Sequence, residues 1–425
     1  MVPSKGYAWD CADPECGEPH AGRRFFSIAL LGLFVTAWLG ALLRWQAITP
    51  TPGLVYGNLL HAHSHMGFLA WVFNAFFALA WVRFVPKSRR RRCIQLFVTL
   101  QIANLGMLLS FPFQGYGPVS IAFTTLHSVA AVWFALLLWR SDRVHPRARP
   151  WLRSSLLCMF ASSLGPVVLG PLAALDLRDT ALYANSIYWY LHFQYNGWFI
   201  LFPLALLAQS VAPQETALRK ALETGFLPVF AGVVLTFGVS LFWNPVPDSL
   251  RLVTAIGAGL QLYGLARIAF AHRSHVNEHA HTPCRIVRGL FHIAWCVLLL
   301  KSLTQLLACA PLATAFVTQR WLIIAFLHSV FLFVVLPTVI ATALQWKWMR
   351  PDCWRRWGLG MFLFAALVTE VALLLPMLRA WLPIPSWTHH PHLLLATAVI
   401  QALAVSLLLL PHSRSEGAST KHAAP

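Results

Sequence analysis

The sequence predicts an all-helical membrane protein, and three observations support this fold class. Of the 425 residues, 58% are hydrophobic and 11% are charged, with a mean hydropathy of +0.63. A soluble globular protein carries about 25% charged residues. The chain also contains twelve long apolar runs, and its basic residues are concentrated in alternate connections between those runs. Together these observations exclude a chain built around a large soluble domain.

Each apolar run is long enough to cross roughly 30 Å of hydrocarbon as a helix. In a helix, a single segment satisfies its own backbone hydrogen bonds within the membrane. The predicted spans cover residues 25–45, 59–84, 93–113, 117–139, 153–175, 183–210, 222–243, 249–271, 287–310, 318–345, 357–379 and 390–411. Residues 1–24 and 412–425 are predicted to be polar tails on either side of this twelve-helix domain, 25–411. No internal sequence repeat is visible.

Basic residues give the orientation. Segments such as "PKSRRRR" (86–92) and "KWMRPDCWRR" (347–356) lie on one side together with both termini, while the other side holds only scattered arginines. The positive-inside rule therefore predicts that both termini are cytoplasmic. This topology, with an anionic lipid surface, accounts for the net charge of +18, so no nucleic-acid partner is expected. The predicted location is the inner membrane of a bacterium.

Histidines occur repeatedly at the outer ends or in the outer halves of the even-numbered spans. At 1.5 Å per residue, a histidine ten residues into a span lies about 15 Å below the surface. Ionisable residues at such a depth are rare and suggest a functional site. Three imidazoles from separate helices suit iron, copper or zinc. The histidines concerned are His61, His63 and His65 in span 2, His127 in span 4, His192 in span 6 and His328 in span 10.

A structural explanation remains open for each histidine. His61 could equally be an ordinary residue of the membrane interface. His127 could be a core histidine whose hydrogen bonds are satisfied. On a helix, His61 and His65 share a face, whereas His63 points about 200° away from either neighbour. His63 is therefore not expected to share one close site with both.

Four further polar residues are candidate catalytic groups. Tyr188 and Tyr195 are expected on the same helix face as His192, where a phenol could donate a proton or serve only as a hydrogen bond between helices. Lys301 and Glu370 lie at matching depths in spans 9 and 11. An unpaired charge there is costly, so the two are expected either to form an ion pair or to belong to a proton path.

The twelve spans and the histidines of spans 2, 6 and 10 resemble the catalytic subunit of the heme–copper oxidase superfamily, which includes oxygen and nitric oxide reductases. The "HAHSHMGF" start of span 2 is also similar to the opening of NnrS-type heme–copper membrane proteins. The resemblance implies that His328 and either His65 or His61 are axial ligands of a b-type heme. It implies that His192 binds copper or non-heme iron.

The sequence departs from the superfamily in three places. Span 7 has no histidine pair, span 10 has one histidine in place of His-x-His, and span 6 lacks His-Pro-Glu. A rearranged site is therefore expected, with His63, His127 and His192 as candidate ligands of a second metal, and with one heme rather than two.

The residues and the resemblance together predict a heme-binding membrane protein that acts on or binds a diatomic gas, NO or O₂, with His65 and His328 as the preferred axial pair. Whether it is an oxidoreductase or a sensor stays open, and the sequence shows no docking site for an electron donor. The alternative is a histidine-lined transporter of a metal ion or small solute.

Overall fold

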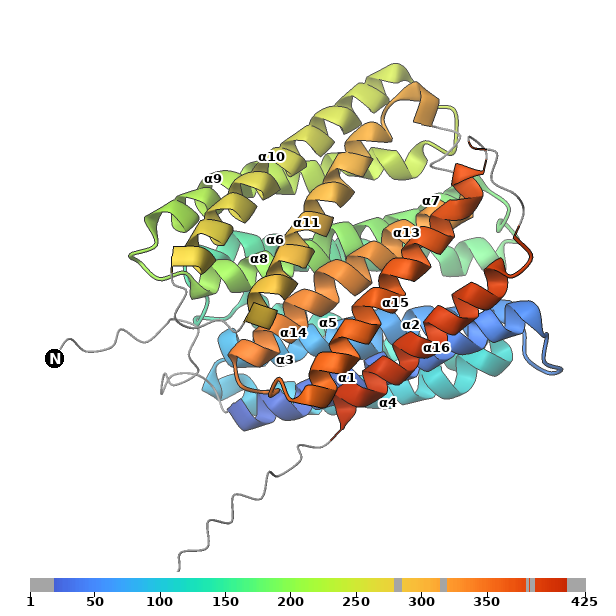
Figure 1. The fold of residues 1–425 in the computed structure, drawn as a ribbon, viewed down its shortest axis with the longest axis horizontal. Helices are drawn as coiled ribbons and strands as arrows, with labels where there is room; N and C mark the ends of the chain where they lie inside the picture. The colour runs from blue at the N-terminus through green and yellow to red at the C-terminus, as the bar shows by residue number, and fades with distance from the viewer. Residues whose placement is uncertain (1–18, 279–284, 314–318, 380–381, 383–386, 411–425) are drawn as a thin grey trace, which may run out of the picture.

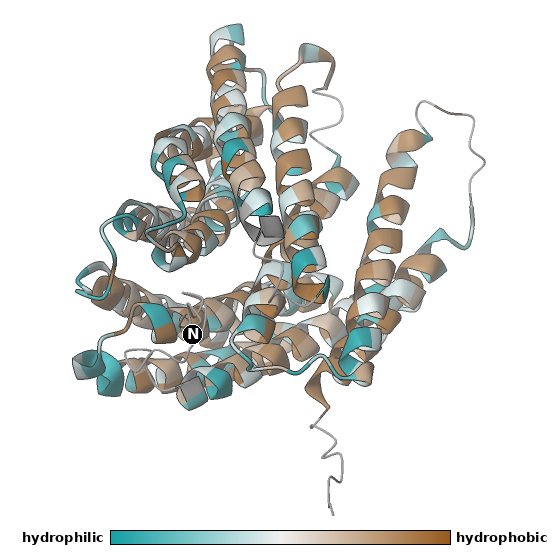
Figure 2. Ribbon diagram, turned by 60° about the vertical axis from the view of Figure 1, so that its left-hand side comes forward, coloured by the Kyte–Doolittle hydropathy of each residue, from teal (hydrophilic) through white to brown (hydrophobic). Residues whose placement is uncertain are grey.

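The computed structural model describes residues 19–278, 285–313, 319–379, 382 and 387–410 (Figure 1). Every regular element in these residues is a helix, and eleven helices are long and apolar enough to cross a membrane. Apolar residues cover most of their length, and polar residues gather in the connections (Figure 2). The predicted all-helical, multi-pass fold class is therefore confirmed.

Most of the predicted spans form one uninterrupted helix each. These helices are α1 (Pro19–Ile48), α4 (Arg90–Gln114), α5 (Pro118–Trp139), α6 (Ala148–Ala174), α10 (Asp248–Glu278), α11 (Arg285–Leu307), α15 (Cys353–Leu378) and α16 (His390–Leu409). Helix α9 (Thr216–Leu235) continues as the 3₁₀ segment η4 (Thr236–Leu241), and short 3₁₀ turns form at η2 (Lys87–Arg89) and η5 (Pro311–Ala313). The predicted N-terminal tail overlaps α1 at residues 19–24. Residues 1–18 and the predicted C-terminal tail lie outside the described residues.

Three spans instead contain a π-helical segment. They are α2 (Tyr56–His65), η1 (Met66–Phe73) and α3 (Asn74–Arg83); α7 (Ala181–His192), η3 (Phe193–Trp198) and α8 (Phe199–Ser210); and α13 (Arg320–Val330), η6 (Phe331–Val335) and α14 (Leu336–Gln345). The second of these, the predicted span 183–210, is helical throughout but is not among the eleven apolar spans, and it carries polar residues at its centre. Because π segments in helices are often found at functional sites, their recurrence in the spans that carry His65, His192 and His328 is informative.

The three π-containing spans meet around one aromatic cluster. The ring centroids of Phe68 and Phe331 are 4.9 Å apart, those of Phe68 and Phe199 5.6 Å, and those of Phe199 and Phe331 5.4 Å. Each spanning segment thus contributes one phenylalanine to a common centre. Pairs at this separation gain both apolar burial and edge-to-face attraction.

The phenylalanine cluster gives a common reference point from which positions in the three spans can be compared. The residue three positions before each phenylalanine is His65 in the first span, Asn196 in the second and His328 in the third. Each of these three residues contacts a different group of polar side chains. The structure therefore has a threefold recurrence that the sequence alone did not reveal.

The first and last described helices start and finish at the same end of the bundle. A Cβ on Gly22, near the start of α1, would lie 2.8 Å from the Trp348 ring, in the connection between α14 and α15. Arg355, in the first turn of α15, donates to the Leu408 carbonyl at the end of α16, at 3.3 Å. The same end holds the basic segments 86–92 and 347–356.

Helix α1 packs directly on the backbone of η1 through Gly32. A Cβ added there would lie 2.2 Å from the Ala70 carbonyl oxygen, which is backbone and cannot rotate away. We expect Gly32→Ala to force α1 and η1 apart and lower the free energy of unfolding by about 1–3 kcal/mol. The thermal unfolding midpoint in detergent measures this.

Gly360→Ala in α15 is the matched control, because a Cβ there would meet nothing within 4 Å. Equal unfolding midpoints for the two variants would contradict the close approach of α1 and η1.

Candidate functional site

Three polar centres lie around the phenylalanine cluster, and we name each by the residue three positions before the phenylalanine. The His328 centre comprises His328, Glu370, His63, Arg44 and Arg320. The His65 centre comprises His65, His61, Tyr116 and His127. The Asn196 centre comprises Asn196, His192, Thr236, Gln261 and Lys301.

In the His328 centre, a histidine and a carboxylate face each other. His328 Nδ1 lies 3.9 Å from Glu370 Oε1, beyond hydrogen-bond distance, and neither atom has another hydrogen-bond partner among the described residues. Yet 30% of the His328 side-chain surface and 13% of the Glu370 surface are accessible. Both side chains therefore combine an orphaned buried atom with a partly accessible surface.

His63 approaches this centre from α2. Its Nδ1 lies 3.0 Å from the Thr36 carbonyl on α1, and Gly40 leaves room for the ring, since a Cβ there would be 3.1 Å from His63 Cε1. A carbonyl only accepts hydrogen bonds, so Nδ1 carries the proton and Nε2 keeps its lone pair. His63 and His328 are close enough to interact electrostatically.

Arg44 lies near the same histidines, and Arg320 lies near Arg44. Arg44 of α1 interacts electrostatically with His63, His328 and Glu370, and also with Arg320 at the start of α13. Arg320 is eight residues before His328, which corresponds to about 12 Å along a helix. Guanidinium groups bind carboxylates with charge-assisted hydrogen bonds, so these two arginines are candidate partners for an anionic ligand.

The His65 centre lies on the opposite face of α2. His65 Nδ1 lies 2.9 Å from the His61 carbonyl, so again the proton is on Nδ1 and the lone pair on Nε2. The His65 ring is 4.3 Å from that of Phe111, and the His61 ring 4.5 Å from that of Tyr116. The expectation that His61 and His65 share a face from which His63 points away is confirmed.

His127 of α5 completes the His65 centre. It is buried, its Nε2 has no hydrogen-bond partner among the described residues, and its ring packs edge-on against Phe73 at 5.1 Å. It interacts electrostatically with His65. A buried imidazole nitrogen without a partner costs free energy, so this nitrogen is a candidate ligand atom.

The Asn196 centre is a fully buried hydrogen-bond network. The Asn196 side-chain oxygen accepts hydrogen bonds from Lys301 Nζ and from Gln261 Nε2, the latter at 3.0 Å. Asn196 Nδ2 donates to Thr236 Oγ1 at 2.8 Å, and Thr236 Oγ1 donates to the Gly232 carbonyl at 2.7 Å. The network links η3, η4, α10 and α11.

His192 borders this network, but one of its nitrogens is committed. Its Nε2 lies 2.8 Å from the Val233 carbonyl and therefore carries a proton, which leaves only Nδ1 for a metal. Asn196 Nδ2 lies 3.5 Å from the same Nε2, but both nitrogens are then donors, so no hydrogen bond joins them. The Tyr195 ring is 6.3 Å from the His192 ring, and the Tyr188 ring lies 6.4 Å from Trp243.

The expected ion pair between Lys301 and Glu370 does not form. Lys301 donates to Asn196, whereas the carboxylate of Glu370 faces His328. The position of a residue along its span does not specify which side of the bundle its side chain faces. The expected proton path through both residues has no direct contact to support it.

The residues predicted as ligands of a second metal are not brought together. His63 belongs to the His328 centre, His127 to the His65 centre and His192 to the Asn196 centre. In the part of the chain that is described, no group of three or more His, Cys, Asp or Glu side chains is arranged to hold a metal ion. The roles of these residues as ligands stay predictions.

Sequence reasoning missed several members of the three centres. These members are Arg44, Thr236 and Gln261, together with Asn196 as the centre of a hydrogen-bond network. A signal existed for Asn196, because it occupies the position of His65 and His328 relative to "F" in "HMGF", "NGWF" and "HSVF". Comparison with known proteins adds no assignment: no protein-family model matches the chain, and no curated protein matches it.

Proposed function

We propose that the protein is a twelve-span protein of the bacterial inner membrane, with both termini cytoplasmic, that binds a b-type heme in its outer half and binds or acts on a diatomic gas. His328 and His63 of the His328 centre would hold the heme. This replaces the pair suggested by the sequence, His65 and His328, because His63 is the histidine of α2 that lies near His328.

The observation that carries this proposal is the state of the imidazole nitrogens. Histidines that bind a metal usually donate their second nitrogen to a carbonyl or a carboxylate. His63 does so to Thr36, and the Nδ1 of His328 faces Glu370. Arg44 and Arg320 suit the two propionates of a heme b. A heme held by two imidazoles supplies a low-spin iron suited to one-electron transfer.

The His65 centre is the proposed place for gas binding. His65 and His127 each have an uncommitted Nε2, and together they could hold copper, non-heme iron or a second heme with an open coordination position. Tyr116, beside His61, would be a hydrogen-bond donor at this centre. The electron donor remains unassigned.

Purified protein tests the proposal. We expect a Soret band and a narrow alpha band after reduction, with heme b found by extraction and iron by metal analysis. Loss of the bands after growth without a heme source, with the protein still folded, is the control. A colourless protein from heme-replete cells that binds zinc would favour the transporter alternative instead.

A further inference from the structure

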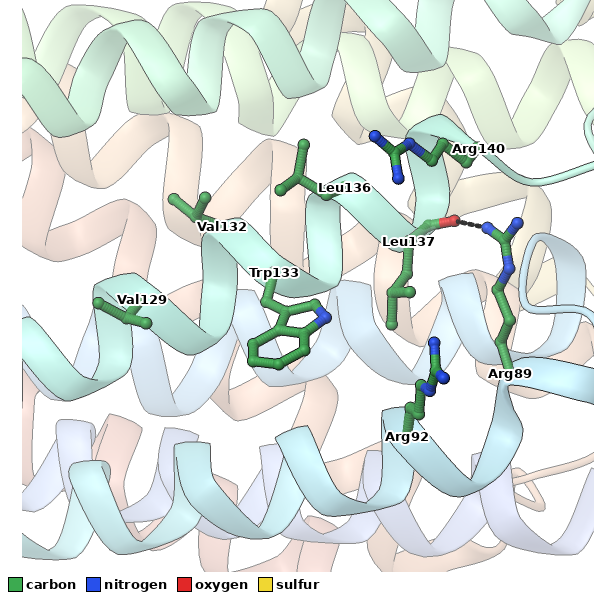
Figure 3. Close-up of a pocket in the computed structure, with 8 residues that line it drawn as sticks. All are labelled: Arg89, Arg92, Val129, Val132, Trp133, Leu136, Leu137 and Arg140. Carbon is green, nitrogen blue, oxygen red and sulfur yellow. Dashed lines mark hydrogen bonds between the residues drawn. The ribbon is translucent and has the colours of Figure 1, made fainter.

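A groove of about 410 Å³ opens at the basic end of the bundle, outside the three polar centres (Figure 3). It lies where α4 begins and α5 ends. Three arginines, Arg89, Arg92 and Arg140, line one end of it, and an apolar wall formed by α5 lines the other. The groove therefore combines a cationic end with an apolar side.

The apolar wall follows one face of α5. Val129, Trp133 and Leu136 are spaced four and three residues apart, so they share a helix face, and they are 58%, 55% and 45% exposed. On a membrane-spanning helix, such a face contacts lipid chains. It leads along the helix toward Arg140, directly after its last residue, Trp139.

At the cationic end of the groove, one guanidinium is held in place by the backbone. Arg89 Nη1 donates to the Leu137 carbonyl at 2.7 Å, which fixes that guanidinium at the edge of the groove (Figure 3). None of the three arginines forms an ion pair with a carboxylate among the residues that the structure describes. Three like charges around one opening repel each other, and a phosphate would relieve this repulsion with charge-assisted hydrogen bonds.

We propose that this groove binds an anionic phospholipid, with its phosphate among Arg89, Arg92 and Arg140 and an acyl chain along Val129, Trp133 and Leu136. The apolar wall argues for a lipid over a free phosphate, because a soluble ion would gain nothing from it. Charge argues for an anionic lipid, since no acidic side chain lines the groove to pair with the ammonium of a zwitterionic headgroup. Basic pockets at the cytoplasmic ends of spans recognise such headgroups elsewhere.

Binding of dioleoyl phosphatidylglycerol to the detergent-solubilised protein, followed by native mass spectrometry, tests the proposal. The triple variant Arg89→Gln, Arg92→Gln, Arg140→Gln should bind at least about twentyfold more weakly, since each charge near an anionic lipid contributes about fivefold. The matched control removes the exposed charges Lys87, Arg91 and Arg149 in the same way and should keep most of the affinity.

Two further arms identify the ligand. Trp133→Ala should weaken phosphatidylglycerol binding without changing the unfolding midpoint, and dioleoyl phosphatidylcholine should bind weakly to every variant. Equal affinity of the two triple variants would overturn the proposal. Displacement of the lipid by millimolar inorganic phosphate or glycerol phosphate would also overturn it, and would assign the arginines to a soluble anion.

Discussion

His328→Ala is expected to lower the heme content of the purified protein at least about tenfold, because it removes a proposed ligand. Even the loss of a residue that only hydrogen-bonds to a metal ligand costs about 10- to 100-fold in metal affinity. The reason is geometric. His328 is the histidine of α13, and its Nδ1 faces Glu370 at 3.9 Å. The ratio of Soret absorbance to protein absorbance measures the loss.

Three companion variants make this test sharp. His392→Ala, an exposed histidine at the start of α16, is the matched control and should keep the full spectrum. His328→Gly should regain heme when imidazole is added, which separates a lost ligand from a misfolded protein. Retention of normal low-spin bands in His328→Ala would remove the basis of the proposed heme site.

The choice between His63 and His65 is decided by the same spectrum. His63→Ala should lose the low-spin bands, whereas His65→Ala should keep them and lose only gas binding. The reverse result would restore the axial pair that the sequence suggested. It would also mean that binding of the cofactor turns the His65 ring away from Phe111, against which it packs at 4.3 Å.

The sequence was sufficient for the fold class because the hydrocarbon core imposes a single requirement, a long apolar helix, that eleven of the twelve predicted spans meet by themselves. The extent of individual helices also followed from the length of the apolar runs. The predicted span 59–84, for example, is helical from Tyr56 to Arg83 in the structure.

Lateral arrangement could not be obtained in this way. A count along a helix gives depth, but partners such as Lys301 and Asn196 are 105 residues apart, and only the packing of α11 against η3 brings them together. Helix faces were read with a period of 3.6 residues, whereas the π segments change the period directly after His65 and His192. The sharing of one helix face by Tyr188, His192 and Tyr195 stays a prediction.

The Asn196 centre shows how the bundle stabilises a lysine inside a membrane. Lys301 is only 2% exposed, and its described partner is the neutral oxygen of Asn196, which also accepts from Gln261. If Asn196 is replaced by a residue without polar atoms, Lys301, Gln261 and Thr236 all lose a partner. A buried polar group left without its partner costs more than the hydrogen bond itself contributes.

Asn196→Leu should therefore lower the free energy of unfolding by about 3 kcal/mol, measured by titration with sodium dodecyl sulfate in mixed micelles. Lys301→Met, which removes the buried amine and keeps an apolar chain of similar length, should cost about 1 kcal/mol or less, because Asn196 retains Gln261 and Thr236 as partners. The double variant should be more stable than Asn196→Leu alone, since the orphaned amine is gone.

A double variant whose loss equals the sum of the two single losses would contradict the direct link between Lys301 and Asn196. A loss in Asn196→Leu no greater than that in the exposed control Asp179→Leu would contradict the stabilising role of the network as a whole.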